Sequence, residues 1–299
     1  MRSPGKAESV THPSNYARHR DGSWRLLVFP ETWSDALWTA VRSGLERERP
    51  SRHPLTRRLR LPSGAGERDY FLKIYFPAAG FMGGLKDLLR DSKAVRALKQ
   101  GEALGRHGFH APPAIAAGEQ RSCGLLRRAF LLTAALEAQP IAALLREQFT
   151  PPLDRTRLAK KRAWLKKLAL QTRRLHELGF VHGDLVPSNI FARPEQEEAE
   201  FFYMDNDRTR RYPAWLPQRL WRRNLVQLNR FVLPGISLQD RMRFLRGYVG
   251  DRSWTESERR LLHWLELKTR QRRKECEQIE TPVSFRELMR WNGPFAQNS

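Results

Sequence analysis

The sequence predicts an α+β fold of two lobes, with a small β-rich lobe followed by a larger helical lobe. At 299 residues, with 40% hydrophobic residues, the chain is long enough for two lobes that share a cleft. In the first part, residues 57–76 contain two β-like runs around a glycine-containing turn, typical of a hairpin. In the second part, patterns of helical period dominate, above all over residues 154–178. We therefore expect a flexible basic arm (1–22), an N-lobe (23–133) and a C-lobe (134–299).

The balance of charge is the outstanding feature of the composition. The chain has 54 Lys and Arg against 32 Asp and Glu, a net charge of +22, which predicts a polyanionic partner such as nucleic acid, an anionic membrane surface or a phosphorylated glycolipid. Its two cysteines, Cys123 and Cys276, fit a reducing compartment. The N-terminus lacks the pattern of a signal peptide, and the longest apolar tract, 129–145, is interrupted by polar residues and proline. We expect a cytoplasmic protein whose contact with a membrane is peripheral.

The N-lobe elements follow from local patterns. Ser92 is suited to cap a helix that ends near residue 107. The segment 133–139 reads as the linker between lobes. The other expected elements are a strand at 24–30, a short amphipathic segment at 33–45, the hairpin at 57–76 and a strand at 125–133.

The C-lobe elements are mainly helical. The apolar stripe of the helix at 154–178 has Lys and Arg on the other face, and Gly179 is suited to end it. Thr255 and Glu258 form the pattern of a capping box ahead of a last helix. The other expected elements are a short helix at 141–148, a hairpin of strands at 190–191 and 201–204, a helix that begins at residue 223 and the last helix at 257–277.

The motif that carries chemistry is H-x-D-x-x-x-x-N, from His182 through Asp184 to Asn189, followed by a strand that ends in Asp205. Phosphoryl transfer needs a carboxylate that accepts the proton of the attacking hydroxyl, and Asp184 is placed for that role. Asn189 and Asp205 supply an amide and a carboxylate oxygen for a metal ion. His182 reads best as a brace for the loop backbone. The pattern as a whole predicts a kinase-type site.

Two further residues complete this prediction. Lys73 lies in the middle of an apolar strand, where it is either an edge-strand charge or an inward ligand of nucleotide phosphates, and the downstream motif favours the ligand. Glu102 shares a helix face with Leu98 and is the expected partner of Lys73, because an acidic residue on a buried face needs a counter-charge. A solvated glutamate is the alternative.

An arginine-rich segment follows Asp205. Residues 206–230 hold seven Arg and one acidic residue, Asp207, in the place where a kinase receives its acceptor. We assign it to an anionic substrate, with a solvated charged face as the alternative. The candidate substrate-binding residues are Arg208, Arg210, Arg219, Arg222 and Arg223.

The motif-bearing segments resemble the lipopolysaccharide core kinases, which act on heptose or Kdo and are similar in fold to protein kinases. The resemblance covers about residues 55–235. Its segments are 70–74, 84–89, 102–108, 111–113, 118–119, 175–184 and 205–208.

The resemblance implies ATP and Mg²⁺ as cofactors. It makes Lys73 and Glu102 the pair that orders the nucleotide, Asp184 the catalytic base, and Asn189 and Asp205 the magnesium ligands. The expected substrate is an anionic glycolipid at the inner face of the cell membrane.

Three departures from the family pattern matter. No G-x-G-x-x-G loop is present, the catalytic loop reads His-Gly-Asp without an Arg at Gly183, and Asn224 stands where members usually carry an Asp. The first leaves the phosphate-covering loop unidentified. The second argues against control by phosphorylation of an activation loop, and the third has no explanation from the sequence.

Two other function classes remain open. One is a kinase of a soluble small molecule, of the aminoglycoside or choline kinase type. The other is non-catalytic, either a kinase-fold scaffold or a basic nucleic-acid binder. The complete Lys/Asp/Asn/Asp set argues against a scaffold, the Arg-rich segment favours an anionic acceptor over an aminoglycoside, and nucleic-acid binding has no motif beyond charge.

Overall fold

The computed structural model describes residues 15–63, 66–77, 90–213, 215, 220–250 and 252–277. The chain divides into two compact units. The first contains residues 1–95 and 113–134, and the second contains residues 96–112 and 135–299. The second unit therefore includes 96–112, which the sequence analysis assigned to the N-lobe, while the change of unit after Ala134 lies one residue from the expected boundary.

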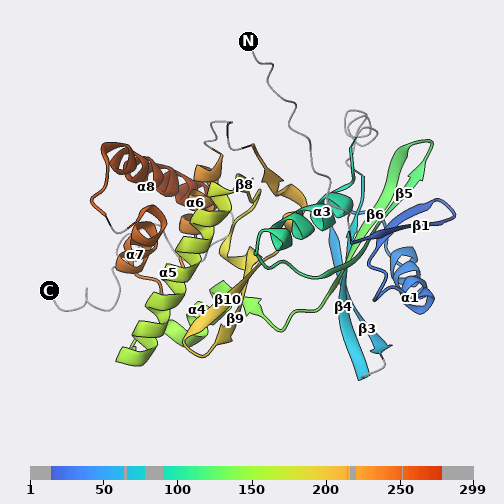
Figure 1. Cartoon of the computed structure of the whole chain (residues 1–299), viewed down its shortest axis with the longest axis horizontal. Helices are drawn as coiled ribbons and strands as arrows, with labels where there is room; N and C mark the ends of the chain where they lie inside the picture. Colours follow the sequence, from blue (N-terminus) through green and yellow to red (C-terminus); the bar gives the residue numbers. More distant parts are fainter. Residues whose placement is uncertain are drawn as a thin grey trace, which may run out of the picture. The chain divides into compact units, whose positions relative to one another are not determined.

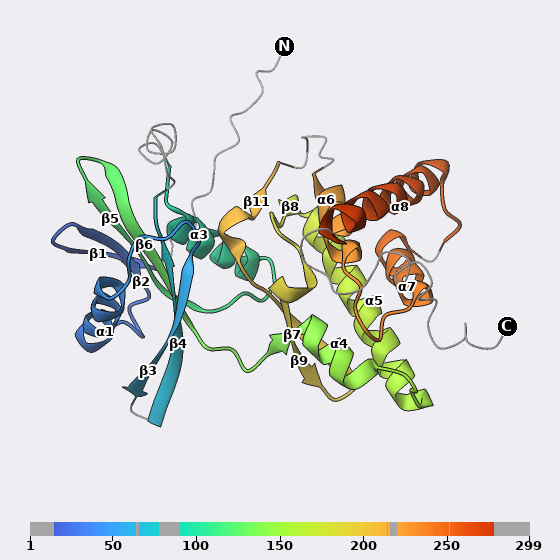
Figure 2. The same ribbon diagram turned by 180° about the vertical axis from the view of Figure 1, so that it is seen from behind.

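The first unit is built on a six-stranded antiparallel sheet with the strand order β1-β2-β5-β6-β4-β3 (Figures 1 and 2). The expected hairpin is confirmed as β3 and β4, and each strand is longer than the sequence pattern indicated. The bounds are β1 Ala17–Asp21, β2 Trp24–Val28, β3 Leu55–Ser63, β4 Gly66–Tyr75, β5 Ala114–Ser122 and β6 Leu125–Ala134.

Strand β1 corrects the prediction that residues 1–22 are a flexible arm. Ala17–Asp21 pairs with β2 along its whole length, and four of its five residues are exposed. Backbone hydrogen bonds rather than buried side chains hold this edge strand, so its sequence carries no apolar pattern. Residues 1–14 of the predicted arm lie outside the described residues.

Helix α1 (Asp35–Glu46) packs on the sheet of the first unit and forms its core. Ser34 caps the helix by accepting a hydrogen bond from the Leu37 amide at 3.2 Å. Trp38 lies between Trp24, whose ring centroid is 5.8 Å away, and Phe130 at 5.9 Å. All three aromatic side chains are buried, which explains why the segment 33–45 shows an amphipathic pattern.

Among the described residues, the second unit contains five complete α-helices, the C-terminal part of α3 and two small sheets. Helix α3 (Lys93–Arg106) begins in the first unit and ends in the second. The small sheets have the orders β10-β9-β7 and β11-β8. The bounds are β7 Gln139–Pro140, α4 Ile141–Phe149, α5 Arg155–Glu177, β8 Phe180–Val181, β9 Ile190–Glu195, β10 Glu198–Tyr203, β11 Arg210–Arg211, α6 Trp221–Arg230, α7 Leu238–Val249 and α8 Glu256–Glu277.

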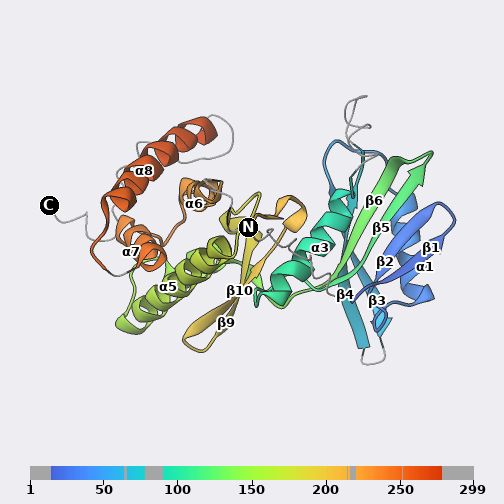
Figure 3. The ribbon, with the colours of Figure 1, turned by 45° about the horizontal axis from the view of Figure 1, so that its top comes forward.

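Helix α5 contacts α4, α7, β8 and β10 of this unit, and α7 packs beside it (Figure 3). Asp154 caps its N-terminus by accepting from the Arg157 amide at 2.7 Å, as the start of the predicted helix requires. The predicted apolar stripe is buried, except that Leu158 is only partly so. The expectation that Lys and Arg fill the other face of this helix is wrong for Lys161, which is buried and lies 2.5 Å from Asp240 of α7.

Helix α7 has no counterpart among the predicted elements. Its N-terminus carries a capping box in which Ser237 and Asp240 exchange side-chain and backbone hydrogen bonds. Its apolar residues Leu238 and Met242 are exposed while Asp240 is buried, so the apolar pattern misrepresents the inner face. The predicted capping box of α8, formed by Thr255 and Glu258, is confirmed by the reciprocal bonds at 2.8 and 3.4 Å.

Candidate active site

The loop that carries the motif begins where α5 ends. Gly179 has φ of +81°, and a Cβ atom there would lie 2.1 Å from the carbonyl oxygen of Tyr212. Only glycine fits this left-handed, crowded position, so the predicted helix stop is confirmed. The chain then forms β8, which pairs with β11, and enters the segment 182–189.

Asp184 and Asn189 are in contact within this loop. The Asn189 amide nitrogen donates to the Asp184 carbonyl oxygen at 3.0 Å and to its carboxylate Oδ2 at 3.3 Å. The five-residue spacing therefore returns the Asn to the Asp, as the motif predicts. Because the amide nitrogen faces Asp184, the amide oxygen points away from it.

The predicted hairpin that follows is confirmed and brings Asp205 to the same loop. Strands β9 and β10 pair with Tyr203 opposite Ile190, and the Met204 amide donates to the Asn189 carbonyl at 2.8 Å. Asp205 comes next and has left-handed backbone angles, φ 56° and ψ 54°. Asp184, Asn189 and Asp205 are thus gathered at one end of this hairpin.

His182 braces the loop backbone, as the sequence analysis expected. Its Nδ1 accepts from the Asp184 amide at 3.2 Å, which leaves the proton on Nε2, and Nε2 donates to the Met204 carbonyl at 2.8 Å. The ring is 1% exposed, and burial lowers the pKa of His182. A neutral imidazole therefore ties the loop to the strand that leads to Asp205.

Asn224, which the sequence left unexplained, is a second support of the loop. It is 1% exposed on α6; its Oδ1 accepts from the His182 amide at 3.1 Å, and its amide nitrogen donates to the His182 carbonyl. His176 of α5 contacts the same Oδ1 through Nε2 at 3.1 Å and the hydroxyl of Tyr248 through Nδ1 at 2.8 Å. Burial lowers the pKa of His176 to about 4, so it is neutral near pH 7.

The backbone near Arg208 approaches Gly183 so closely that position 183 has no room for a side chain. A Cβ at this position would lie 2.2 Å from the Cβ of Arg208 and 2.7 Å from its carbonyl oxygen. No other residue fits there without a shift of backbone, which explains physically why the loop reads His-Gly-Asp. The contact also places the backbone of Arg208 directly against the loop.

The candidate substrate arginines differ in their surroundings. Arg208, Arg210 and Arg223 are exposed. Arg222 is partly buried, with its guanidinium 5.5 Å from the ring centroid of Trp221 and 5.9 Å from that of Trp264, so it has a packing role. Arg219 lies outside the described residues, as does the segment 84–89 of the resemblance.

Lys73 and Glu102 lie in different units. In the first unit, Lys73 is partly exposed at the middle of β4, between Leu72 and Ile74, which are fully buried. In the second unit, the side chain of Glu102 is 12% exposed and lies 3.8 Å from Arg106, one turn further along α3. Pairing of Lys73 with Glu102 remains a prediction.

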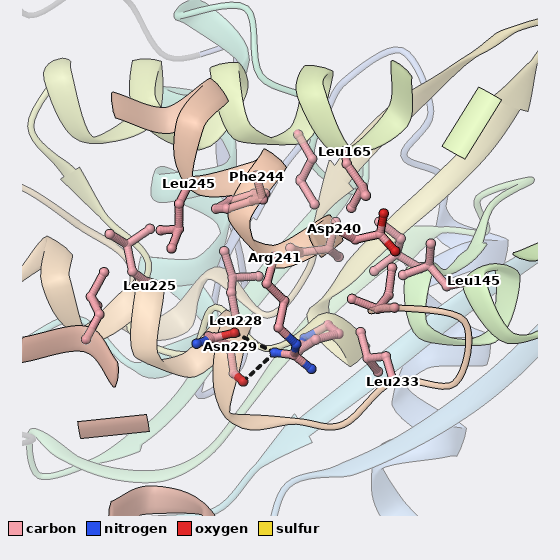
Figure 4. Close-up of a pocket in the computed structure, with 16 residues that line it drawn as sticks. Leu145, Leu165, Leu225, Leu228, Asn229, Leu233, Asp240, Arg241, Phe244 and Leu245 are labelled. Carbon is pink, nitrogen blue, oxygen red and sulfur yellow. Dashed lines mark hydrogen bonds between the residues drawn. The ribbon is translucent and has the colours of Figure 1, made fainter. Parts of the chain in front are cut away.

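A separate apolar cavity of about 90 Å³ lies within the second unit, between α5, α6 and α7. Figure 4 shows Arg241 beside it, with hydrogen bonds to Asn229. Burial lowers the pKa of Arg241 to about 9, with the nearby Arg273 adding to the shift. The apolar lining of the cavity includes Leu145, Leu165, Leu225, Leu228, Leu233, Phe244 and Leu245.

Among the described residues, no group of three or more His, Cys, Asp or Glu side chains is placed to hold a metal ion. No helix among those residues is long and apolar enough to span a bilayer.

Comparison with known proteins identifies related kinases. The model of the lipopolysaccharide kinase (Kdo/WaaP) family matches residues 85–248, which is more than half of the chain. No curated protein matches the chain in sequence. The resemblance inferred from the sequence is thus confirmed.

Among solved structures, WaaP in complex with acyl carrier protein is similar over 83% of this chain and 98% of its own, with a TM-score of 0.57 and 22% identity. The PknI kinase domain from Mycobacterium tuberculosis covers 74% of this chain and 92% of its own, at 13% identity and a TM-score of 0.38. The MAP kinase LmaMPK10 from Leishmania major covers 87% and 72%, at 14% identity and a TM-score of 0.38. The family match and the fold shared with WaaP confirm the predicted α+β, kinase-like fold.

Proposed function

Because the chain belongs to the lipopolysaccharide kinase (Kdo/WaaP) family, we propose that it transfers the γ-phosphoryl group of ATP to a hydroxyl of heptose or Kdo in the lipopolysaccharide core. Membership of a kinase family makes it a phosphotransferase with a sugar hydroxyl as acceptor. One observation best supports phosphoryl transfer at this site. Asn189 contacts Asp184, and the backbone next to Asp205 is hydrogen-bonded to Asn189.

Asp184 is the proposed general base. The oxygen of the acceptor hydroxyl forms a bond to the γ-phosphorus, the bond from that phosphorus to the β,γ-bridging oxygen breaks, and ADP leaves. Asp184 accepts the proton of the hydroxyl. Its orientation is fixed on one side by the hydrogen bond from Asn189.

Asn189 and Asp205 are the proposed ligands of Mg²⁺. Their amide and carboxylate oxygens are hard donors of the kind this ion prefers, and two protein ligands suffice when nucleotide phosphates and water complete the shell. The bound ion supplies neutralisation of charge on the phosphates. The chain's own part is to hold the two oxygens on one hairpin end.

Lys73 and Glu102 are the proposed pair that orders the nucleotide phosphates, in keeping with the burial of the Glu102 side chain. A double-mutant cycle with Lys73→Met and Glu102→Gln tests the pair. Coupled losses of activity support it, and additive losses contradict it.

The exposed arginines after Asp205 are the proposed contacts for the acceptor, which is anionic and anchored at the cytoplasmic face of the membrane. Arg208 has the strongest claim, because its backbone lies against Gly183, next to Asp184. The net charge of +22 favours approach to an anionic surface.

An acyl carrier protein is a further proposed partner. The solved WaaP structure contains one. Co-purification of this chain with an acyl carrier protein would support the partner, and failure of the two purified proteins to bind each other would contradict it.

A kinase of a soluble small molecule remains the second candidate. It would share the loop from His182 to Asn189 and differ in its acceptor site. The exposed Arg210 and Arg223 favour an anionic acceptor over a cationic aminoglycoside or choline.

Mass spectrometry of lipopolysaccharide tests the proposed function. Cores from cells that lack the protein should be lighter by one phosphate than cores from cells that express it. Cells that express Asp184→Asn should match the cells that lack the protein. Cores of identical mass in all three would refute the assignment to lipopolysaccharide and leave the small-molecule kinase as the better candidate.

A further inference from the structure

The side chain of Gln227, on α6, forms hydrogen bonds with the backbone on both sides of Asp184. Its Oε1 accepts from the Leu185 amide at 3.1 Å, and its Nε2 donates to the Gly183 carbonyl at 3.2 Å. The same Nε2 lies 3.5 Å from the Asp184 carboxylate Oδ1. Helix α6 runs beside β8, which leads into this loop (Figures 1 and 2).

The orientation of this side-chain amide follows from groups that can only donate. The His182 amide donates to Asn224 Oδ1, so the nitrogen of Asn224 faces the other way, toward Gln227 Oε1 at 2.9 Å. The Leu185 amide also donates to that Oε1. Two donors on one oxygen fix Gln227 with its Nε2 toward Gly183 and Asp184.

We propose that Gln227, oriented by Asn224, is a positioning residue that sets the Asp184 carboxylate for proton transfer. The two carboxylate oxygens are then each met by one amide, Oδ1 by Gln227 and Oδ2 by Asn189. A carboxylate held from both edges cannot rotate without loss of a hydrogen bond. This inference rests on the proposed function, in which Asp184 is the base.

The proposal also explains Asn224. An aspartate at this position could accept from the His182 amide but could not donate to the His182 carbonyl or to Gln227 Oε1. The chain therefore uses two linked amides, three residues apart on α6, in place of a charged support. Asn224 acts on Asp184 only through its neighbours.

Gln227→Glu tests the donated and the accepted hydrogen bonds of Gln227 separately. The glutamate keeps an acceptor for the Leu185 amide but turns its other oxygen toward the Gly183 carbonyl and the Asp184 carboxylate, where no proton remains to share. We expect turnover to fall about ten- to a hundredfold while the KM for ATP changes less than threefold. Gln271→Glu, the same change at an exposed site on α8, should leave both constants unaltered.

A double-mutant cycle with Asp184→Asn distinguishes positioning from general support of the fold. The side-chain amide that Asp184→Asn introduces can donate to a glutamate at position 227, so Gln227→Glu should cost less than threefold in that background. A loss of the same size in both backgrounds would overturn the proposal, as would unaltered turnover in the single variant. The rates are those of phosphoryl transfer from ATP to core lipopolysaccharide.

Hydrogen exchange provides a readout that does not depend on activity. Gln227→Met, which removes every hydrogen bond of the side chain at similar volume, should abolish protection of the Leu185 amide, whereas Gln227→Glu should retain it. Unchanged protection in Gln227→Met would contradict the hydrogen bond between Gln227 and the Leu185 amide. This result does not depend on whether the wild-type chain transfers phosphate to lipopolysaccharide. A wild-type chain that shows the protection but no transfer would instead contradict the proposed function.

Discussion

At the scale of the residue, Asp205 combines a charged group with an uncommon backbone. Its left-handed angles, φ 56° and ψ 54°, are tolerated by Asp and Asn better than by other side chains. Asp205→Asn therefore keeps the backbone and removes only the charge. That property makes it a clean test of the proposed metal ligand.

The two carboxylates of the site should respond differently to the same change. Asp184→Asn should lower turnover about 10²- to 10⁴-fold, the usual contribution of a general base, while nucleotide binding is kept. Asp205→Asn should weaken binding of magnesium-nucleotide as well, because it removes a metal ligand. Calorimetry of nucleotide binding beside steady-state rates checks both. Near-normal transfer by Asp184→Asn would disprove its role as the base.

His176 should make the protein less stable in mild acid. Its pKa is about 4 in the folded chain and about 6.5 when unfolded, so between these values the unfolded state binds the extra proton. This contribution to stability is complete above pH 6.5 and is lost as pH falls toward 4, by about 2 kcal/mol at pH 5 relative to pH 8.

His176→Gln keeps a donor for Asn224 and an acceptor for Tyr248 but does not titrate. Its free energy of unfolding, measured by urea denaturation, should fall by about 2 kcal/mol less than that of the wild type between pH 8 and pH 5. An identical acid dependence in both proteins would show that His176 is not the group responsible.

At the scale of the element, α5 and α7 are joined by the ion pair of Lys161 and Asp240. The side chains are 5% and 2% exposed. Burial would raise the pKa of Asp240, but the hydrogen bonds from Lys161 and Ser237 outweigh it and hold the pKa below its usual value. A pair so deeply buried costs most when only one partner is removed.

Lys161→Met should lower the free energy of unfolding by about 3 kcal/mol, because it leaves the Asp240 carboxylate buried without its nearest cation. Adding Asp240→Asn should cost less than about 1 kcal/mol more, since no uncompensated charge then remains. Lys166→Met, at an exposed position of the same helix, is the matched control. Strictly additive losses in urea denaturation would exclude the coupling.

The same elements show what the sequence could predict. Apolar period and capping residues located α5 and α8 well, because their caps are local and their inner faces are apolar. They failed for α7, whose buried residues include Asp240, and for β1, which is held mainly by backbone pairing. A buried polar contact depends on a partner distant in sequence, so no local pattern reveals it.

The candidate site divides in the same way. The motif residues Asp184, Asn189 and Asp205 were found by spacing, and the structure gathers them at one loop. The supports on α6, Asn224 and Gln227, were not, because they lie about forty residues away and carry no charge. Their only sequence signal was the departure from the family pattern at Asn224.

At the scale of the whole molecule, the net charge of +22 should direct the protein to anionic membranes. The chain should sediment with vesicles that contain anionic lipid and stay free of neutral ones. Arg210→Glu with Arg223→Glu should weaken that binding by at least thirtyfold, since each exposed arginine near the surface contributes about 1 kcal/mol.

Arg18→Glu with Arg20→Glu, at exposed positions of β1, makes the same change in net charge at another place. Equal weakening by both pairs would show that net charge alone matters and that the arginines after Asp205 have no special part. Equal binding of the wild type to neutral and anionic vesicles would exclude the membrane proposal.

We propose that this chain phosphorylates the lipopolysaccharide core at a site formed by Asp184, Asn189 and Asp205. The most direct measurement is transfer of labelled phosphate from γ-labelled ATP, with magnesium, by the purified protein. Core lipopolysaccharide, an aminoglycoside and choline serve as parallel acceptors. We predict label in the lipopolysaccharide alone, and its loss with Asp184→Asn. Label in a small acceptor alone, or undiminished label with Asp184→Asn, would contradict the account.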